Sequence, residues 1–261
     1  MSARLRLQLP LWALSWPLAA GALAPPLRIA FDAGSLPTMY ADAHGAPAGI
    51  YPALVRQAFE LMGEPAEWVA EPFRRLLAAL FAGSAAAGAA VRNDERLAVA
   101  DYSADYFVEQ LRLFHADAMA PPAPGIAGLR GLRVGVLRGW SYGEAFDAAR
   151  ARQLFQAEEV ETDAKNFAKL QRGRLDAVVA TELAGRMLLS GEQGPVGIVA
   201  LPQPLISIGI ALAVPKRLAA RPLLQRFDAA IATLRREGRV DAIVAAELER
   251  ARRLRPAADG H

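Results

Sequence analysis

Apolar and polar positions alternate in two different periods through the first half of the chain. Residues 27–31 alternate in the manner of a strand, whereas apolar residues between positions 52 and 62 recur at helical spacing and stop at Gly63. The same reasoning predicts strands over 27–31, 67–69 and 86–91, helices over 52–62 and 73–82, and a polar turn over 92–96. This β-α-β-α-β order is typical of an α/β sheet with helices on its faces.

The same rhythm starts again after a segment rich in proline and glycine, residues 119–131. Residues 132–136 repeat the pattern of the opening strand, residues 27–31. The elements predicted after them are helices over 142–154 and 164–172, strands over 157–161, 177–180 and 208–214, and a helical region over 219–253. The chain is therefore expected to form two α/β units, with a C-terminal segment that packs on one of them.

Two nearly matching segments receive opposite predictions. Residues 173–183 and residues 238–248 share the pattern Gly-Arg-apolar-Asp-Ala-apolar-Val-Ala. We interpret the first as a strand and the second as a helix from their surroundings alone. Because the flanking sequences do not match, we treat the likeness as coincidence and not as a structural repeat.

The first 24 residues have the features of a secretory signal. Arg4 and Arg6 form a basic start, residues 11–18 are apolar, and small residues at 20–24 provide an Ala-x-Ala cleavage site. The alternative is a membrane anchor, but Pro10 and Pro17 interrupt an apolar run that is already shorter than the ~20 residues a span requires. No later segment is predicted to span a membrane. We expect an exported, soluble protein.

Composition narrows the classes of function. With 53% hydrophobic and 22% charged residues, the 261-residue chain has enough apolar material for a core, which excludes intrinsic disorder. The absence of cysteine excludes disulfides, thiolate metal sites, cysteine nucleophiles and an N-terminal lipid anchor. Removal of residues 1–24 lowers the formal charge from +3 to +1. The late arginines alternate with acids, so no nucleic-acid partner is expected.

Several motifs in a fixed order resemble a known family. Glu95-Arg96 is followed by Asp101-Tyr102-Ser103-Ala104-Asp105-Tyr106, and segments 37–40, 45–50, 131–139 and 173–179 complete the set. Over residues 27–250 the chain is similar to the bacterial extracellular (periplasmic) solute-binding proteins of the polar-amino-acid ABC transporter type. The family pattern at the first motif is a Glu-Arg pair followed, at the same spacing as in this chain, by Asp-Phe-Ser-x-Pro-Tyr.

The resemblance implies a two-lobed α/β fold, the type II or Venus-flytrap fold of periplasmic binding proteins, with two hinge crossings. We expect the crossings near 107–115 and 200–208. The implied division is a signal peptide over 1–24, lobe 1 over 25–110 and 205–255, lobe 2 over 111–204, and a disordered tail over 256–261. The ligand would lie in the cleft, and the lobes would close on it by a hinge motion.

The resemblance also implies which arginines bind the ligand. Arg96 matches the family arginine that pairs with the ligand α-carboxylate, and a guanidinium presents a planar fork of donors to a carboxylate. The alternative is a surface arginine beside Asp94 or Glu95. Arg92, four residues earlier, is a second candidate. Arg74, which like its neighbour at position 75 follows Pro-Phe, is either a cleft residue or part of a solvated face.

Gly139-Trp140-Ser141 opens a predicted helix directly after a strand. Free amides and a hydroxyl at a helix N-terminus favour an anionic group, and the family holds the ligand carboxylate with a turn of hydroxyl residues here. Only Ser141 carries over, and Trp140 either covers the cleft or packs against its own lobe. Tyr40 and Phe31 are the candidate aromatic walls of lobe 1, with ordinary core positions as the alternative.

Two departures from the family pattern bear on the ligand. The acid that binds the ligand amino group falls at Thr181, with Glu182 one residue later, and the family's Gly-Phe-Asp segment reads Gly49-Ile50-Tyr51. A buried ammonium without a carboxylate is very costly. Either Glu182 takes over this role or the ligand has no ammonium, so an amino acid is the leading candidate only.

Residues 139–143 also spell Gly-x-Ser-x-Gly between a predicted strand and helix, the setting of a hydrolase nucleophile such as Ser141. The one histidine after it is His261, the last residue, where a catalytic base would be poorly held. The other histidines, His44 and His115, lack metal-ligand spacing. Some relatives of this fold are dehydratases, so enzymatic use of the cleft remains an alternative.

The sequence thus favours a periplasmic solute-binding protein, monomeric and without cofactor or metal. It would capture a small carboxylate-bearing ligand and present it to an ABC permease of the inner membrane. The alternatives are an enzyme that uses the same cleft, through Ser141 or in a dehydratase-like manner, and a sensory or scaffold protein outside transport.

Overall fold

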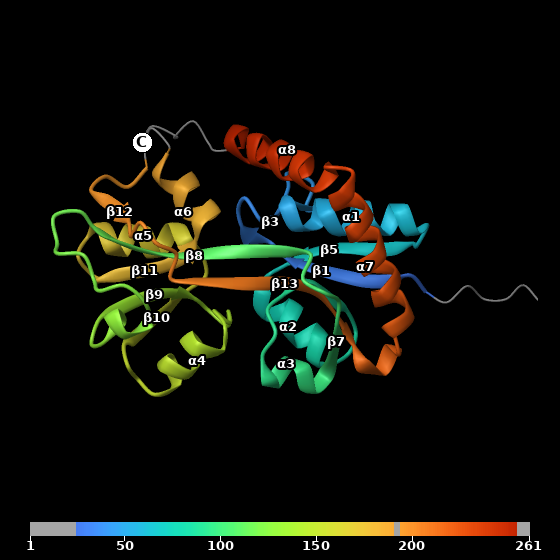
Figure 1. Cartoon of the computed structure of the whole chain (residues 1–261), viewed down its shortest axis with the longest axis horizontal. Coiled ribbons are helices and arrows are strands. Elements are labelled where there is room, and N and C mark those ends of the chain that lie inside the picture. The colour runs from blue at the N-terminus through green and yellow to red at the C-terminus, as the bar shows by residue number, and fades with distance from the viewer. Residues whose placement is uncertain (1–24, 191–193, 255–261) are drawn as a thin grey trace, which may run out of the picture.

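Two long antiparallel strands, β8 (Phe107–Ala116) and β13 (Ile206–Pro215), run through the middle of the molecule (Figure 1). The structure, a computed structural model, describes residues 25–190 and 194–254. The strands pair with each other from Phe107 opposite Ile210 to Leu111 opposite Ile206. Beyond this pairing β13 continues into the sheet of one lobe, and β8 into the sheet of the other. The molecule is therefore two-lobed with two crossings, which confirms the predicted fold class.

Lobe 1 is built on the sheet order β13-β6-β1-β5, with β7 added beside the far end of β13. Its strands are β1 (Leu27–Asp32), β5 (Ala66–Glu71), β6 (Ala86–Ala90) and β7 (Ala100–Tyr102), and a small separate sheet holds β2 (Gly34–Ser35), β3 (Met39–Ala41) and β4 (Pro47–Ala48). β6 consists only of alanine and glycine and is wholly buried. The Phe31 ring packs so closely on Gly88 that an added Cβ there would lie 2.2 Å from it. Small residues in β6 thus make room for the aromatic core.

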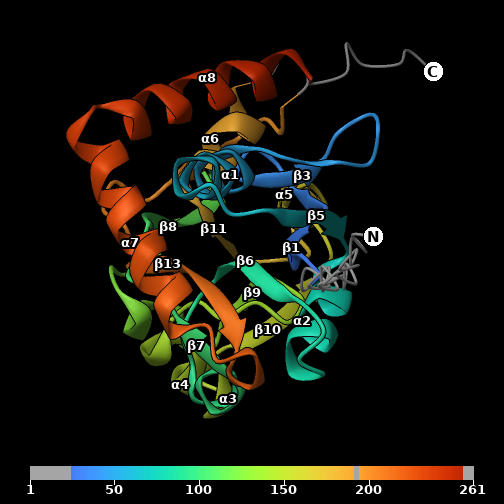
Figure 2. The same cartoon turned by 90° about the vertical axis from the view of Figure 1, so that its right-hand side faces the viewer.

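Helices cover both faces of this sheet. They are α1 (Ile50–Met62), α2 (Phe73–Phe81) and α3 (Asp94–Val99), joined by α7 (Arg221–Arg236) and α8 (Arg239–Arg253) from the C-terminal segment after a short 3-10 turn, η2 (Lys216–Leu218). α1 buries one face and packs against α7 and α8, and α8 crosses the top of the lobe in both views (Figures 1 and 2). The Phe59 ring contacts Trp68 and Phe227 in the core between α1, β5 and α7.

Lobe 2 contains the sheet order β10-β9-β11-β8, with β12 paired to β8. Its elements are η1 (Ile126–Leu129), β9 (Arg133–Leu137), α4 (Glu144–Ala151), β10 (Gln156–Val160), α5 (Asp163–Gln171), β11 (Ala177–Thr181), α6 (Glu182–Leu189) and β12 (Ile198–Ala200). Phe114 of β8 packs against Phe167 of α5, with ring centroids 5.0 Å apart. Lobe 2 therefore has its own aromatic contact beneath its helices.

Most predicted elements are present, and the differences have local causes. The polar turn at 92–96 is wrong, because the Asn93 side chain accepts a hydrogen bond from the Arg96 amide and caps α3. The predicted helical region over 219–253 is present as two helices, because Gly238 adopts a φ of 69° and separates α7 from α8. The opposite predictions for the two matching segments are confirmed in their central parts, since residues 177–181 form β11 and residues 239–248 lie in α8.

The lobe boundaries at 110/111 and 204/205 stay predictions; the first falls within β8, and the second lies just before β13 begins at Ile206. The predicted signal peptide, residues 1–24, and the predicted tail, residues 256–261, lie outside the described residues. Within the described part of the chain, no helix is both long and apolar enough to cross a membrane.

Replacement of Gly185 by alanine tests the packing of lobe 2. A Cβ at this position would lie 2.0 Å from Cζ of the buried Phe114 ring. We expect Gly185→Ala to reduce the free energy of unfolding by about 1–3 kcal/mol, the usual cost of overpacking, as measured by urea denaturation. Gly34→Ala is the control, because its nearest neighbour would be the Thr162 methyl group at 4.0 Å. Equal stability of Gly185→Ala and wild type would contradict this packing.

Candidate functional site

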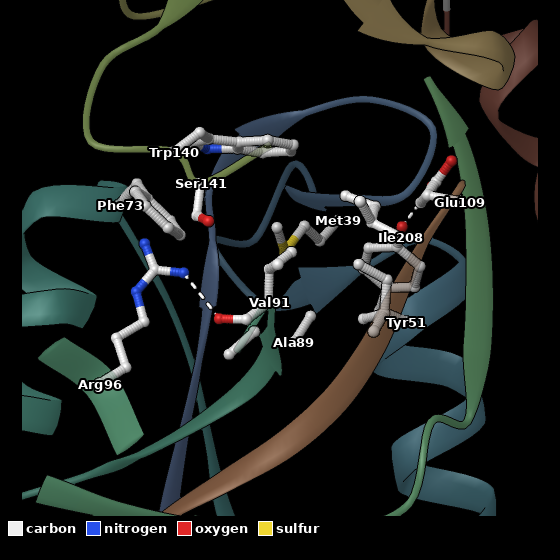
Figure 3. Close-up of a pocket in the computed structure, with 12 residues that line it drawn as sticks. Met39, Tyr51, Phe73, Ala89, Val91, Arg96, Glu109, Trp140, Ser141 and Ile208 are labelled. Carbon is white, nitrogen blue, oxygen red and sulfur yellow. Dashed lines mark hydrogen bonds between the residues drawn. The ribbon is translucent and has the colours of Figure 1, made fainter. Parts of the chain in front are cut away.

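A narrow pocket lies between the lobes, where β6, β8 and β13 meet the loop between β9 and α4 (Figure 3). The residues that line it are mostly apolar: Met39, Tyr51, Phe73, Ala89, Ala90, Val91, Arg96, Glu109, Trp140, Ser141, Ile208 and Ile210. Its cavity volume is about 20 Å³, which suffices for one water molecule. A larger molecule can therefore enter only when the lobes move apart.

Arg96 lies at one end of this pocket and is 3% exposed. Its guanidinium donates to the carbonyl oxygens of Val91 and Gly139, each at 3.0 Å, and lies 5.7 Å from the centre of the Phe73 ring. Among the described residues no carboxylate forms an ion pair with it. Burial lowers the pKa of Arg96, and this effect is opposed by the more distant Tyr102, Asp147 and Glu95. A buried cation held only by neutral carbonyls is suited to receive an anion.

Trp140 forms the upper wall of the pocket and reaches across to lobe 1 (Figure 3). Its ring centre is 5.8 Å from that of Phe73, so the two aromatic residues link the lobes beside the hydrogen bond from Arg96 to Gly139. A second, larger cavity of about 430 Å³ lies on the other side of this pair. Arg74 lines that second cavity together with Asp32 of β1. The structure thus separates Arg74 from Arg96.

Ser141 lines the pocket, but its hydroxyl is engaged within lobe 2. Its Oγ donates to Asp147 Oδ2, and Oδ1 of the same carboxylate accepts the amide of Tyr142 at 3.2 Å. Asp147, which the sequence analysis did not single out, therefore fixes this loop. The described histidines lie elsewhere: His44 is in an exposed turn, and Nδ1 of His115 on β8 is 2.9 Å from Ala116 O. The hydroxyl of Ser141 is thus paired with a carboxylate and not with an imidazole.

Glu109 lies at the opposite end of the pocket from Arg96 (Figure 3) and is 2% exposed. Its Oε1 accepts a hydrogen bond from the hydroxyl of Tyr51, whose ring contacts Tyr106 edge-on at 6.0 Å. The pKa of Glu109 is raised to about 7, mainly by burial and also by the nearby Asp163 and Glu182, while the Tyr51 hydrogen bond opposes the shift. The pocket therefore contains an acid that is partly protonated near neutral pH.

Sequence reasoning missed Glu109 because no motif marks it. The available signal was its position: a charged residue at an inward-facing place in a strand that reads Phe-Val-Glu-Gln-Leu-Arg-Leu-Phe. The apolar wall residues Met39, Phe73 and Ile208 were missed for a similar reason. Each is an ordinary core residue type, and only the contact between lobes brings them together.

The remaining predicted residues lie outside the pocket. Tyr40 is buried on the side of lobe 1 that faces α8; burial raises the pKa of its hydroxyl, and Arg250 on that helix opposes the shift. Phe31 stacks on Trp68 in the core, with ring centres 6.5 Å apart. Arg92 pairs with Asp105. The structure therefore does not place Tyr40, Phe31 or Arg92 in the pocket wall.

The two residues at the expected ammonium-binding position are also engaged elsewhere. Thr181 Oγ1 accepts the Ala184 amide at 3.1 Å and so caps α6. Glu182 pairs with Arg112 at 2.9 Å and also with Arg186, one turn along α6. Neither side chain lines the pocket. Of the eight predicted ligand-binding residues, the pocket brings together Arg96, Trp140 and Ser141.

Glu109→Gln tests the burial of this acid. Between pH 4.5 and about 7 the folded protein binds more protons than the unfolded chain, because the pKa of Glu109 is raised on folding. Wild-type stability at this site is therefore greatest below pH 4.5 and is lost as the pH rises through 7. We expect the stability of Glu109→Gln relative to wild type to increase by roughly 2–3 kcal/mol between pH 4.5 and 8, measured by denaturation. A constant difference across this range would contradict the assignment.

Comparison with known proteins gives one family and many related folds. The family "Bacterial extracellular solute-binding proteins, family 3" matches residues 27–246. A search among curated proteins gives no match.

Three solved structures illustrate the shared fold. A histidine kinase sensor domain with similarity to periplasmic binding proteins is 24% identical, with a TM-score of 0.74 over 86% of this chain and 96% of that one. An amino acid ABC transporter substrate-binding protein from Streptococcus pneumoniae, bound to L-arginine, is 19% identical, with a TM-score of 0.70 over 87% and 95%. An ancestral arginine-binding protein bound to arginine is 21% identical, with a TM-score of 0.70 over 85% and 97%.

These likenesses agree with the two-lobed fold, and the family match extends through both lobes. The chain belongs to the bacterial extracellular solute-binding proteins, family 3.

Proposed function

We propose that this protein captures a small carboxylate-bearing solute between its lobes, with an amino acid or a close analogue as the ligand. The observation that carries the proposal is the state of Arg96. Its guanidinium is buried in the interlobe pocket and bonded to two neutral carbonyl oxygens, without an ion-pair partner among the described residues. A ligand carboxylate would supply the missing negative charge. The arginine-bound relatives support a ligand of this size and type.

Capture would couple ligand binding to closure of the lobes. Arg96 belongs to lobe 1 and donates to Gly139 of lobe 2, and Phe73 faces Trp140 across the same gap. A carboxylate placed at Arg96 would lie where both lobes contact it. Since the pairing of β8 with β13 joins the two lobes, bending of these two strands provides the opening.

The wider role includes export and delivery. The family assignment supports an extracytoplasmic location, and the predicted signal peptide at 1–24 would direct the chain to the periplasm. We propose that the protein acts as a monomer and presents its ligand to an ABC permease of the inner membrane, as the family relatives named as transporter components suggest.

A sensory role is the second candidate function. The observation in its favour is the similarity to a histidine kinase sensor domain over 86% of this chain. Ligand capture at Arg96 would serve that role equally, with a signalling partner in place of a permease. Crosslinking in the native membrane distinguishes the two, because a transport protein captures permease subunits and a sensory protein captures a kinase.

Arg96→Met tests the proposed carboxylate site. Isothermal calorimetry with a panel of amino acids and small carboxylates is expected to give affinities of about 1 μM for the preferred wild-type ligand. Loss of the guanidinium leaves the ligand carboxylate unpaired in a closed cleft, so the variant should bind about 2–5 kcal/mol more weakly.

Arg92→Met is the matched control for this experiment. Arg92 lies four residues earlier in the chain, just before α3, and its guanidinium pairs with Asp105 outside the pocket. We expect this variant to bind the same ligand with wild-type affinity. Unchanged affinity in Arg96→Met, or equal losses in both variants, would overturn the proposed role of Arg96.

A further inference from the structure

The pocket has two charged side chains in its wall, and they have opposite signs. Arg96 and Glu109 lie at opposite ends in Figure 3, and the wall between them is formed by Met39, Ala89 and Val91. The remaining lining residues carry no charge. A ligand that satisfies both ends therefore has an anionic group and a cationic group separated by an apolar body.

Both charges are buried without a counter-charge. Arg96 is 3% and Glu109 is 2% exposed, and no ion pair involves either of them within the described ranges 25–190 and 194–254. Glu109 receives one hydrogen bond, from the Tyr51 hydroxyl. A buried charge is costly unless it is paired, so each end of the pocket lacks one partner of the opposite sign.

The lobe 2 carboxylates that could bind an α-ammonium beside Arg96 already have partners within the protein. Asp147 accepts hydrogen bonds from the Ser141 hydroxyl and the Tyr142 amide. Glu182 is paired with two arginines, and Thr181, at the expected acid position, caps α6. An α-amino acid bound through Arg96 would thus have its ammonium next to groups that cannot neutralise it.

We propose that the ligand is an ω-amino acid, with its carboxylate on Arg96, its terminal ammonium on Glu109 and its methylene chain along the apolar wall. This inference rests on the proposed function, because it takes Arg96 as the carboxylate site. Glu109 is then the residue that determines specificity. A dicarboxylate would place a negative charge beside Glu109, and a diamine would place a positive charge beside Arg96, so the pocket disfavours both.

The surroundings of Glu109 favour the arrival of a cation. The groups that act on it are Tyr51 from α1, Tyr106 just before β8, Asp163 from α5 and Glu182 from α6. All four are neutral or acidic. Because an ammonium stabilises the ionised form of Glu109, binding near pH 7 should release a proton from this carboxyl group, whose pKa in the free protein is about 7.

Calorimetry with a graded series of ligands tests the inference. The probes are β-alanine, 4-aminobutanoate, 5-aminopentanoate and 6-aminohexanoate, each compared with the alkanoate of the same length and with the 2-amino isomer. We expect one ω-amino acid of intermediate length to bind at least 10-fold more tightly than its alkanoate and its 2-amino isomer. A preference for the 2-amino isomers, or no binding of any ω-amino acid, would overturn the inference.

Two variants identify the acid that binds the ammonium. Glu109→Gln should lower the affinity for the preferred ω-amino acid at least 10-fold and leave the affinity for the matching alkanoate unchanged. A variant that is partly unfolded would instead lose affinity for both ligands. Glu158→Gln, which changes a lobe 2 acid paired with Lys169 outside the pocket, should leave both affinities unchanged. Equal binding of the ω-amino acid by wild type and Glu109→Gln would overturn the role of Glu109.

The proton balance provides a readout that a merely structural role would not change. Calorimetry of the ω-amino acid at pH 7 in buffers of different ionisation enthalpy should show proton release for wild type and none for Glu109→Gln.

Arg96→Met distinguishes this inference from the proposed function. If it abolishes binding of carboxylates while Glu109→Gln has no effect, the proposed function stands and this inference fails. If Arg96→Met has no effect on any probe, both fail.

Discussion

The pairing of β8 with β13 is the constraint on which the rest of the molecule depends. Five residue pairs join the strands, from Phe107 opposite Ile210 to Leu111 opposite Ile206. The two strands connect the lobes, and their register also places Glu109 opposite Ile208, so that both line the pocket. A shift of the register by one residue would turn these side chains to the other face of the sheet. The hinge and the floor of the pocket are thus one structural element.

The contacts that close the pocket are few and lie at one edge of it. The hydrogen bond from Arg96 to Gly139 and the aromatic pair of Phe73 and Trp140 connect the lobes on the side where the second cavity begins. Each of these contacts involves a residue of the pocket wall. A ligand at Arg96 would therefore compete with, or add to, the same interactions that hold the lobes together, which links occupancy to closure.

How far the sequence can predict this protein is illustrated by the two nearly matching segments. In residues 177–181 every side chain is buried, because β11 lies between β8 and β9 in the sheet. In the second segment, Val240, Ile243, Val244 and Leu248 are partly buried at helical spacing against the core of lobe 1. Context alone distinguished them, and correctly. Context did not show the break at Gly238, because a glycine within a helical pattern either continues or ends it.

The sequence by itself determined the family fold and singled out Arg96. The spacing of strands and helices gives two α/β units, and a short motif contains both Asn93, which caps α3, and the arginine whose side chain that helix positions. Only the tertiary structure decided the composition of the pocket. Tyr40, Arg92, Thr181 and Glu182 lie outside the pocket wall, because each contacts other parts of the protein. Glu109, which no sequence motif marks, lies in the wall. The physical reason is that pocket membership depends on which residues face each other across two lobes, and local periodicity carries no information about that contact.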